Sequence, residues 1–291
     1  MCPGSGHVLW GVSHAAIPVV SEVNGAVSVY FSARDADGRS MIGVGAFDLA
    51  RPADGFVAAP APVLGLGPLG AFDDSGVTTA CLAVGEGRRL LYYTGWTRGV
   101  TVPFYFYIGV AAERADGSYA RVSAAPVLER NAIDPYLTAS PSVLYDNGSW
   151  RMWYVSCVRW DLVDGQPRHY YHIKYAESSD AIAWTRTGTV CIDFAPGEYA
   201  FARPHVVKDA DGLYRMWYSY RGDRYRIGYA ESRDGISWER KDHLAGIDVS
   251  ASGWDSEMVA YPTVFDHGGQ RYMLYNGNGY GRTGFGLAIA R

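Results

Sequence analysis

The hydrophobic and polar positions along this chain form a repeated pattern of short strands separated by turns. Residues 175–184 read YAESSDAIAW, and a near-duplicate, YAESRDGISW, follows at 229–238. A matching aromatic run precedes each copy, WRMWYVS at 150–156 and YRMWYSY at 214–220. Because self-similarity at a fixed spacing is the signature of a repeat architecture, the chain is predicted to consist of repeated units.

Weaker copies extend this pattern to five units. Each unit starts with a Pro-x-Val motif and continues with a turn, an aromatic strand and a third strand that contains Ile-Gly or its equivalent. The motif occurs at 18–20, 141–143, 204–206 and 262–264, with 76–78 as a degenerate copy. Turn dipeptides such as Asn24-Gly25 and Asp211-Gly212 separate the strands, which is typical of antiparallel hairpins and not of βαβ crossovers.

A fourth strand follows the third in several units, for example at 184–192 and 238–247. Four antiparallel strands per unit predict a propeller blade, so the predicted fold class is all-β, a single five-bladed β-propeller over residues 1–291. The blades are expected at about 13–66, 71–129, 134–193, 198–248 and 255–291. The last unit ends after its third strand, so residues 7–12 are predicted to supply the missing strand and close the ring.

Composition excludes several classes of protein. Hydrophobic residues make up 48% of the chain and charged residues 19%, which excludes a disordered chain. No apolar run is long enough to span a membrane and no secretory signal opens the sequence, so no membrane partner is expected. With 26 basic and 30 acidic residues and no basic block, no nucleic-acid partner is expected. The four cysteines are scattered, which indicates structural thiols in a cytoplasmic protein. No cofactor is predicted.

The inner strands of a propeller line a central tunnel, and the loops that enter these strands form a rim around a pocket. Side chains alternate along a strand, so the residues on either side of each repeated Pro are predicted to face the tunnel. These tunnel residues are Ile17, Val19, Ser75, Val77, Ser140, Ser142, Arg203, His205, Tyr261 and Thr263.

Acidic residues of the entering loops are the candidate catalytic groups: Asp73, Asp74, Glu198 and Glu257. Glycosyl transfer needs one carboxyl group to donate a proton and another to act as base or nucleophile. We therefore predict Glu198 or Glu257 as proton donor and Asp73 or Asp74 as base. The alternative for each acid is a turn cap or an arginine partner. Asp180 and Asp234, which recur in the repeated turns, are predicted to be structural.

Further polar and aromatic residues at the rim and tunnel are predicted to bind substrate. Aromatic rings can stack on sugars, and Arg203 can either clamp an anionic group or neutralise nearby acids. His14 and His205 lack HxH or HExxH spacing, so no metal site is predicted. The predicted substrate-binding residues are His14, Asp134, Tyr136, Ser140, Arg203, His205, Trp254, Tyr261 and Arg282.

The Pro-x-Val units, the Asp-x-Gly turns and the ESRDGISW-type turns resemble the five-bladed propeller superfamily over residues 8–291. That superfamily includes arabinanases, β-xylosidases, invertases, levansucrases and β-mannoside phosphorylases. Segments 140–156 and 253–286 are also similar to propellers associated with the biosynthesis of glycans or sugar-containing metabolites. The resemblance implies a glycoside hydrolase-like enzyme. Ile17 and Val77 stand where arabinanase-like members carry acids, so those two acids do not carry over.

Three functions remain open at this point. The first is a glycoside hydrolase-like enzyme that acts on a glycosidic bond or an activated sugar in the central pocket. The second is a non-hydrolytic biosynthetic enzyme, a cyclase, isomerase or lyase, that uses one acid and Arg203 for proton transfer. The third is a propeller that binds a carbohydrate or small molecule without catalysis. In each case the expected partner is a sugar, a glycan or another small molecule, and the oligomeric state stays open.

Overall fold

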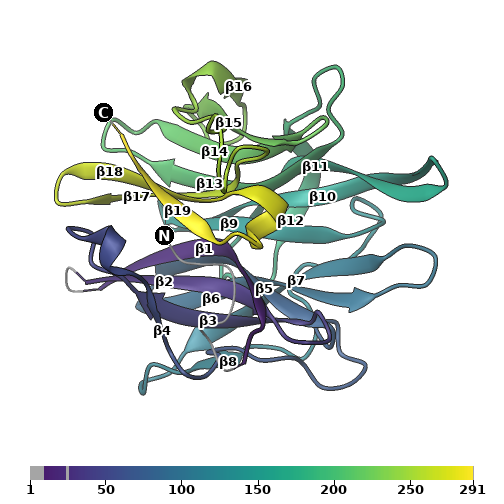
Figure 1. The fold of residues 1–291 in the computed structure, drawn as a ribbon. Coiled ribbons are helices and arrows are strands. Elements are labelled where there is room, and N and C mark those ends of the chain that lie inside the picture. Colours follow the sequence, from purple (N-terminus) through teal and green to yellow (C-terminus); the bar gives the residue numbers. More distant parts are fainter. Residues whose placement is uncertain (1–9, 24–25, 291) are drawn as a thin grey trace.

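The computed structural model describes residues 10–23 and 26–290, which form β-strands with three short 3₁₀ helices between them (Figure 1). The all-β prediction is confirmed. Antiparallel pairing divides the described strands into five groups. The first is β1 (Ser13–Val23), β2 (Ala26–Arg34), β3 (Ser40–Ala46) and β4 (Val57–Ala58); the second is β5 (Gly76–Gly85), β6 (Arg88–Arg98), β7 (Phe104–Glu113) and β8 (Tyr119–Arg121).

The other three groups follow in chain order. The third is β9 (Thr138–Asp146), β10 (Ser149–Val163), β11 (Gln166–Ser178) and β12 (Thr185–Ile192). The fourth is β13 (Ala200–Lys208), β14 (Tyr214–Arg221), β15 (Tyr225–Ser232) and β16 (Glu239–Arg240). The fifth is β17 (Ala260–His267), β18 (Gln270–Asn276) and β19 (Phe285–Ile289). The 3₁₀ helices are η1 (Pro52–Asp54), η2 (Asp242–Leu244) and η3 (Asn278–Gly281). Among the described residues no helix is long and apolar enough to cross a membrane.

A β-bulge interrupts the inner strand of four groups just before its repeated Pro. Ile17, Ser140, Arg203 and Tyr261 have left-handed backbones with φ of 52°, 47°, 53° and 58°. The pairing register of β1, β9, β13 and β17 shifts at the same places. A bulge re-aims side chains and ends strict alternation, so the two residues flanking each Pro need not share one face.

One hydrogen bond recurs between three pairs of successive groups and holds the inner strand at its bulge. The N–H of Thr79 in β5 donates to Ser32 Oγ of β2 over 2.9 Å, and the N–H of Ser140 in β9 donates to Thr94 Oγ1 of β6 over 2.9 Å. The N–H of Tyr261 in β17 donates in the same way to Ser219 Oγ of β14 over 2.7 Å. At these three places a small polar side chain on the second strand of one group anchors the inner strand of the next.

The same bond joins the last group to the first. The N–H of Ile17 in β1 donates to Asn276 Oδ1 of β18 over 2.7 Å, and the Asn276 amide donates back to the carbonyl of Ala15 over 2.8 Å. Thr263 Oγ1 of β17 also donates to the carbonyl of Pro18 over 2.5 Å. In Figure 1 the C-terminal strands accordingly lie beside β1.

The position of the recurring bond corrects the predicted register of the second group. Thr79 occupies the place of Ser140 and the other bulge residues, so Ala80 stands where the other units have Pro. The five copies of the motif then start at positions 18, 80, 141, 204 and 262, and 76–78 is not the degenerate copy. Val77 is fully buried in a core cluster with Leu91 and Tyr93, so it does not face the tunnel as predicted.

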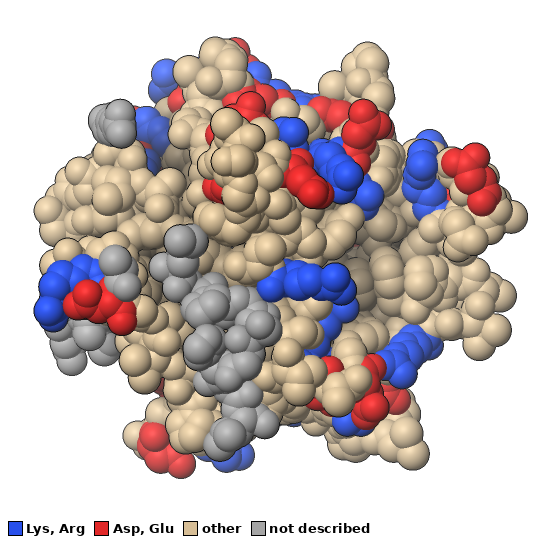
Figure 2. Space-filling view, viewed as in Figure 1, with Lys and Arg blue, Asp and Glu red and all other residues tan. Residues whose placement is uncertain are grey.

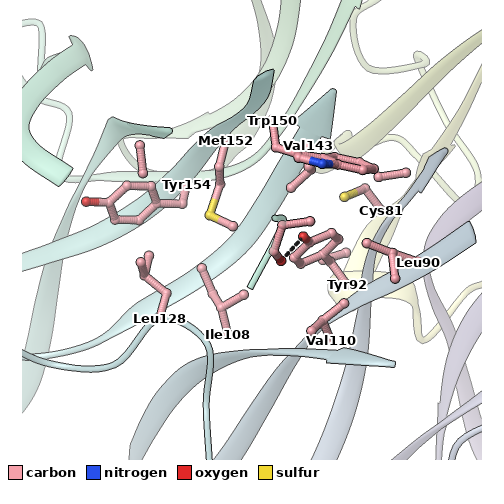
Figure 3. Close-up of a cluster of buried hydrophobic side chains, with 14 residues drawn as sticks. Cys81, Leu90, Tyr92, Ile108, Val110, Leu128, Val143, Trp150, Met152 and Tyr154 are labelled. Carbon is pink, nitrogen blue, oxygen red and sulfur yellow. Dashed lines mark hydrogen bonds between the residues drawn. The ribbon is translucent and has the colours of Figure 1, made fainter. Parts of the chain in front are cut away.

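Large aromatic and aliphatic side chains pack between neighbouring groups. Figure 3 shows the cluster between the second and third groups, where the fully buried rings of Tyr92 and Trp150 lie among Leu90 and Met152. The Tyr92 hydroxyl donates to the carbonyl of Ala181 over 2.6 Å, because a buried hydroxyl needs a partner. The repeated aromatic residues thus form the contact faces of the groups.

The predicted N-terminal strand at 7–12 is described only in part. Residues 7–9 lie outside the described residues. The N–H of Val12 donates to the carbonyl of Arg34 at the end of β2, and the Trp10 ring lies 5.9 Å from that of Phe31. Residues 10–12 therefore contact the first group. Ring closure by this N-terminal segment stays a prediction.

Candidate functional site

A cavity of about 950 Å³ opens where the inner strands of all five groups converge. In Figure 2 the face shown is hollowed near its centre, and Lys and Arg side chains border the hollow. Pockets of about 300–1,000 Å³ are typical of small-ligand sites. The lining residues are His14, Ile17, Arg34, Thr78, Thr94, Trp96, Arg98, Gly99, Pro103, Phe104, Phe106, Ala139, Ser140, Val155, His169, Tyr171, Phe201, Ala202, Arg221, Tyr225, Tyr261, Gly279, Tyr280 and Arg282.

Four of the predicted substrate-binding residues line this cavity: His14, Ser140, Tyr261 and Arg282. Ser140 and Tyr261 are bulge residues of β9 and β17, and their left-handed backbones expose these side chains to the cavity. His14 of β1 also has a left-handed backbone, with φ of 65°. Arg282 follows η3, in the glycine-rich loop of the last group. These four residues remain proposed ligand contacts.

Arg203 and His205 lie among the inner strands and not in the cavity wall. Arg203 is 1% exposed, and its Nη2 donates to the carbonyl of Pro18 over 3.1 Å and to Thr263 Oγ1 over 2.9 Å. His205 Nε2 lies 2.8 Å from the carbonyl of Val264. Both side chains therefore connect inner strands of different groups, which is a structural role that the sequence did not reveal.

Trp254 and Tyr136 also lie outside the cavity lining. Trp254 packs against Tyr275, with ring centroids 5.3 Å apart, and covers two glycines of the last group. A Cβ added at Gly277 would lie 2.4 Å from the Trp254 ring, and one added at Gly286 would lie 2.5 Å from it. Those glycines make room for the ring, so Trp254 is a packing residue. Tyr136 is 38% exposed on the loop before β9.

The predicted acids of the second and third groups are parts of a repeated structural motif. Asp73 is buried, accepts a hydrogen bond from the Tyr93 hydroxyl over 3.2 Å and pairs with Arg121 of β8 at 2.7 Å. Asp134 accepts from the Tyr154 hydroxyl over 2.9 Å and pairs at 2.9 Å with Arg186 of β12. In both, the acid precedes its tyrosine by the same separation in sequence, and its arginine lies on the fourth strand. The motif ties the entering loop to the second and fourth strands of its group.

The fourth and fifth groups vary the same motif. Glu198 forms a two-pronged ion pair with Arg240 of β16, at 2.9 Å and 2.8 Å, in place of a bond to Tyr218. Asp255 accepts from the Tyr275 hydroxyl over 2.8 Å. One such acid occurs in each of these four groups at an equivalent place, so Asp73 and Glu198, which we predicted as catalytic, and Asp134, which we predicted to bind substrate, belong to a structural repeat. The signal that would have revealed them is the downstream tyrosine, which recurs at a constant separation from the acid.

The remaining two predicted catalytic acids differ from each other. Asp74 caps its own loop, because it accepts from the N–H of Gly70 over 3.0 Å and from Ser75 Oγ over 2.9 Å. Glu257 is 59% exposed and lies 3.4 Å from Arg224. Its backbone N–H donates to Asn278 Oδ1 over 2.8 Å, next to Gly279 of the cavity wall. Among the four predicted catalytic acids, Glu257 alone combines exposure with a place beside the cavity mouth.

The two acids predicted to be structural are turn caps. Asp180 Oδ1 accepts from the backbone N–H groups of Ile182 and Ala183, each over 2.8 Å. Asp234 Oδ1 makes the equivalent bonds in the next group, and hydrogen bonding from those N–H groups outweighs burial and lowers its pKa to about 2. This prediction is confirmed.

The cavity wall is basic and aromatic. Arg34, Arg98, Arg221 and Arg282 line it, and none of the lining residues is Asp or Glu. Within the described part of the chain no acidic side chain forms an ion pair with these four arginines, whereas Arg121, Arg186 and Arg240 each hold an acid. Of these four arginines, only Arg282 was predicted from the sequence. The available signal was that Arg34, Arg98 and Arg221 end β2, β6 and β14, the second strands of their groups.

Three histidines at the inner strands and cavity are uncharged at neutral pH. Burial, with nearby Arg34 and Arg282, lowers the pKa of His14 to about 4. Burial lowers the pKa of His169 to about 4, together with Arg221 and Arg168, and burial with Arg203 does the same for the pKa of His205. Neutral His14 can accept a proton at a cavity that carries several guanidinium groups. No cluster of potential metal ligands occurs among the described residues.

These histidines predict how stability depends on pH. Between pH 6.5 and 4 the unfolded chain binds protons at His14, His169 and His205 that the folded chain does not bind. These histidines should therefore lower the free energy of unfolding as pH falls across this window, and their contribution should be complete near pH 4. Urea unfolding at half-unit pH steps measures the slope. His205→Gln should flatten it, and an unchanged slope in that variant would contradict the assignment.

No family model matches this chain. Two proteins of Mycobacterium tuberculosis, Rv1502 of strain H37Rv and MT1551 of strain CDC 1551, both described as uncharacterized, are each 45% identical to it over 287 residues. The match covers 98% of this chain and 95% of each of these proteins.

Solved structures with a similar fold include several glycoside hydrolases. A BT0996 complex with RGII aligns with a TM-score of 0.78 at 17% identity, covering 100% of this chain and 90% of that one. A thermostable family-43 glycoside hydrolase gives 0.73 at 15% identity, covering 97% and 90%. A GH130 protein from a study of β-1,2 mannosidic linkages in Candida mannan gives 0.69 at 19%, covering 97% and 85%. The chain thus has a glycoside hydrolase-like β-propeller fold.

Proposed function

This chain belongs to the same protein family as Rv1502 of Mycobacterium tuberculosis, and from its cavity we propose that it is a carbohydrate-active enzyme. The cavity, with its walls of aromatic rings, carries the proposal. Trp96, Phe104, Tyr225 and Tyr280 belong to its lining, and aromatic rings are the usual partners on which sugar rings stack. The glycosidase-like fold supports the same conclusion, and one structural neighbour is a complex with RGII.

We further propose that the five strand groups are five blades of one closed ring around this cavity. The bond from Ile17 to Asn276 repeats the bonds that join successive groups, which supports closure between the last group and the first. A closed ring would hold the bulge residues of all inner strands in fixed relative positions, as a site shared among five groups requires.

Hydrolysis of a glycosidic bond is the leading reaction, with Glu257 as the proposed proton donor and His14 as the group that accepts a proton. Glu257 is exposed beside the cavity mouth, and His14 lines the cavity in its neutral form. Asp73, Asp74 and Glu198 are not proposed as catalytic groups, because each one already binds partners within its own strand group.

A non-hydrolytic reaction, such as an isomerisation or an elimination, is the second candidate. The observation that favours it is a cavity lined by histidines and tyrosines with no lining carboxylate among the described residues. Turnover in heavy-oxygen water separates the two, because hydrolysis places solvent oxygen in the product and an isomerisation or elimination does not.

The proposed site is tested by filling the cavity. Ala202 of β13 lines it, so Ala202→Trp should abolish binding and turnover of any saccharide that the wild-type protein accepts in a calorimetric and mass-spectrometric screen. Ala115→Trp, in an exposed turn before β8, is the matched control and should retain both. Binding that survives in Ala202→Trp, or a wild-type protein that binds no saccharide, would contradict the proposal.

The role of Glu257 is tested separately. Glu257→Gln should lower turnover by about 10²- to 10⁴-fold, the usual contribution of a positioned acid or base. Its stability should stay unchanged, because the side chain is exposed and makes one ion pair at 3.4 Å. Glu239→Gln removes another exposed glutamate, 74% exposed and also ion-paired, and its turnover should equal that of the wild type. Wild-type turnover in Glu257→Gln would exclude this residue as the proton donor.

A further inference from the structure

The four cavity arginines gather at one cavity without acidic partners. Arg34, Arg98, Arg221 and Arg282 form no ion pair with an acidic side chain of the described residues, and no acidic residue lines the cavity; Arg121, Arg186 and Arg271, by contrast, each hold an acid. Guanidinium groups stay charged in proteins and match carboxylates and phosphates with two parallel hydrogen bonds. An arginine-lined cavity without acids therefore favours an anionic occupant.

One end of the cavity holds two buried polar atoms without partners. The hydroxyl of Tyr171 and the Nε of Arg221 have no hydrogen-bond partner among residues 10–23 and 26–290, and both residues line the cavity. The backbone of Tyr199 lies between them and bonds to both, because the N–H of Tyr171 donates to the carbonyl of Tyr199 and the N–H of Tyr199 donates to the carbonyl of Arg221. A buried polar group without a partner destabilises the protein, and a bound ligand that supplies the partner removes this cost.

Aromatic rings hold Arg221 in place. Its guanidinium carbon lies 5.3 Å from the ring centroid of Tyr199, 5.5 Å from that of Tyr225 and 5.9 Å from that of Tyr280. The Tyr171 ring stacks on His169 with centroids 4.1 Å apart. Cation–π contacts fix the position of Arg221 without neutralising it, so its charge stays available to a ligand.

Building on the proposed carbohydrate function, we infer that the cavity selects sugars that carry a carboxylate or a phosphate, and that Arg221 and Tyr171 bind this anionic group. The guanidinium of Arg221 and the hydroxyl of Tyr171 donate to its oxygens. The rings of Tyr225 and Tyr280 flank the sugar. Arg34 and Arg282, on the side of His14, add attraction without the rigid aromatic cage that surrounds Arg221.

Matched ligand pairs test this inference. Calorimetry compares methyl hexuronides with methyl hexosides, and hexose phosphates with hexoses, each in the gluco, galacto and manno configurations. At least one charged sugar should bind about 10- to 100-fold more tightly than its neutral counterpart, the usual gain from hydrogen bonds to a charged group. Raising the salt concentration should reduce this preference by screening. The uronides and the phosphates form separate arms, so the screen also identifies which anion is bound.

Variants connect the preference to the two residues. Arg221→Gln should reduce the preference for the charged over the neutral sugar to less than about 3-fold. Tyr171→Phe should weaken binding of the charged sugar about 3- to 10-fold. Arg114→Gln, in an exposed turn, is the matched control and should change neither. Equal binding of neutral and charged sugars would overturn this inference and leave the proposed function intact, whereas no binding of any saccharide would overturn both. Inorganic phosphate that binds as tightly as the sugar phosphates would also overturn it.

Discussion

Asp134→Asn is expected to lower the free energy of unfolding by about 3–5 kcal/mol. Asp134 is 0% exposed, and its two oxygens lie 3.0 Å from Lys174 Nζ and 2.9 Å from Arg186 Nη1. Burial acts to raise its pKa, but hydrogen bonds from Ser156 and Lys174 and the Lys174 charge outweigh burial, so the pKa lies below its ordinary value. The amide would leave two cations in the protein interior without their counter-ion. Urea unfolding measures the loss.

Asp74→Asn is the matched control, because Asp74 binds a backbone N–H through one oxygen and a serine hydroxyl through the other and pairs with no cation of the described residues; the Asn oxygen can accept from the Gly70 N–H while its amino group donates to the Ser75 hydroxyl. We expect it to cost less than about 1 kcal/mol. If Asp134→Asn kept the wild-type stability and instead lost turnover, Asp134 and the other repeated acids would have to be reconsidered as catalytic groups.

Asn276→Ala is the second large effect, with an expected loss of about 3–6 kcal/mol in the free energy of unfolding. Asn276 is fully buried and makes three bonds of 2.7 or 2.8 Å, with the N–H of Ile17, the carbonyl of Ala15 and the carbonyl of Gly284. Alanine would leave all three backbone groups without their partner, and each such group costs about 1–3 kcal/mol. Two of the three belong to β1, so the substitution releases the first group from the last. Urea unfolding measures this loss as well.

Thr94→Ala and Ser219→Ala are the controls for this experiment. Each removes one recurring bond between successive groups and should cost about 1–3 kcal/mol, at most half the effect of Asn276→Ala. Equal losses in the three variants would show that the link between the last group and the first has no special weight, which would count against a closed ring.

The sequence predicted the strands well because their signals are local. Aromatic runs, turn residues and the Pro-x-Val motif recur in sequence, and each strand forms near these signals. The register of the second group was wrong because Ala80 replaces the Pro that marks the bulge elsewhere, while the bulge itself persists at Thr79 and Cys81. A hydrogen bond from another group, to Ser32, holds that bulge.

The acids show where sequence reasoning failed. Asp73, Asp134 and Glu198 were predicted to face a ligand or to do chemistry, but the partners that decide their roles are arginines on the fourth strands of their groups, far along the chain. No local pattern indicates which arginine will pair with which acid. For the same reason the sequence did not indicate Arg34 and Arg221, which are important because no acidic side chain among the described residues pairs with them.

The sequence by itself determined the all-β class and the repeat, because these depend on neighbours within one hairpin or one copy of the unit. Only the tertiary structure decided which polar residues face the cavity. Five bulges change the direction of side chains on the inner strands. Ion pairs within each group hold the repeated acids, whereas the cavity arginines have no acidic partner among the described residues. Charge pairing acts between segments far apart in the chain, so the basic character of the site emerges only after folding.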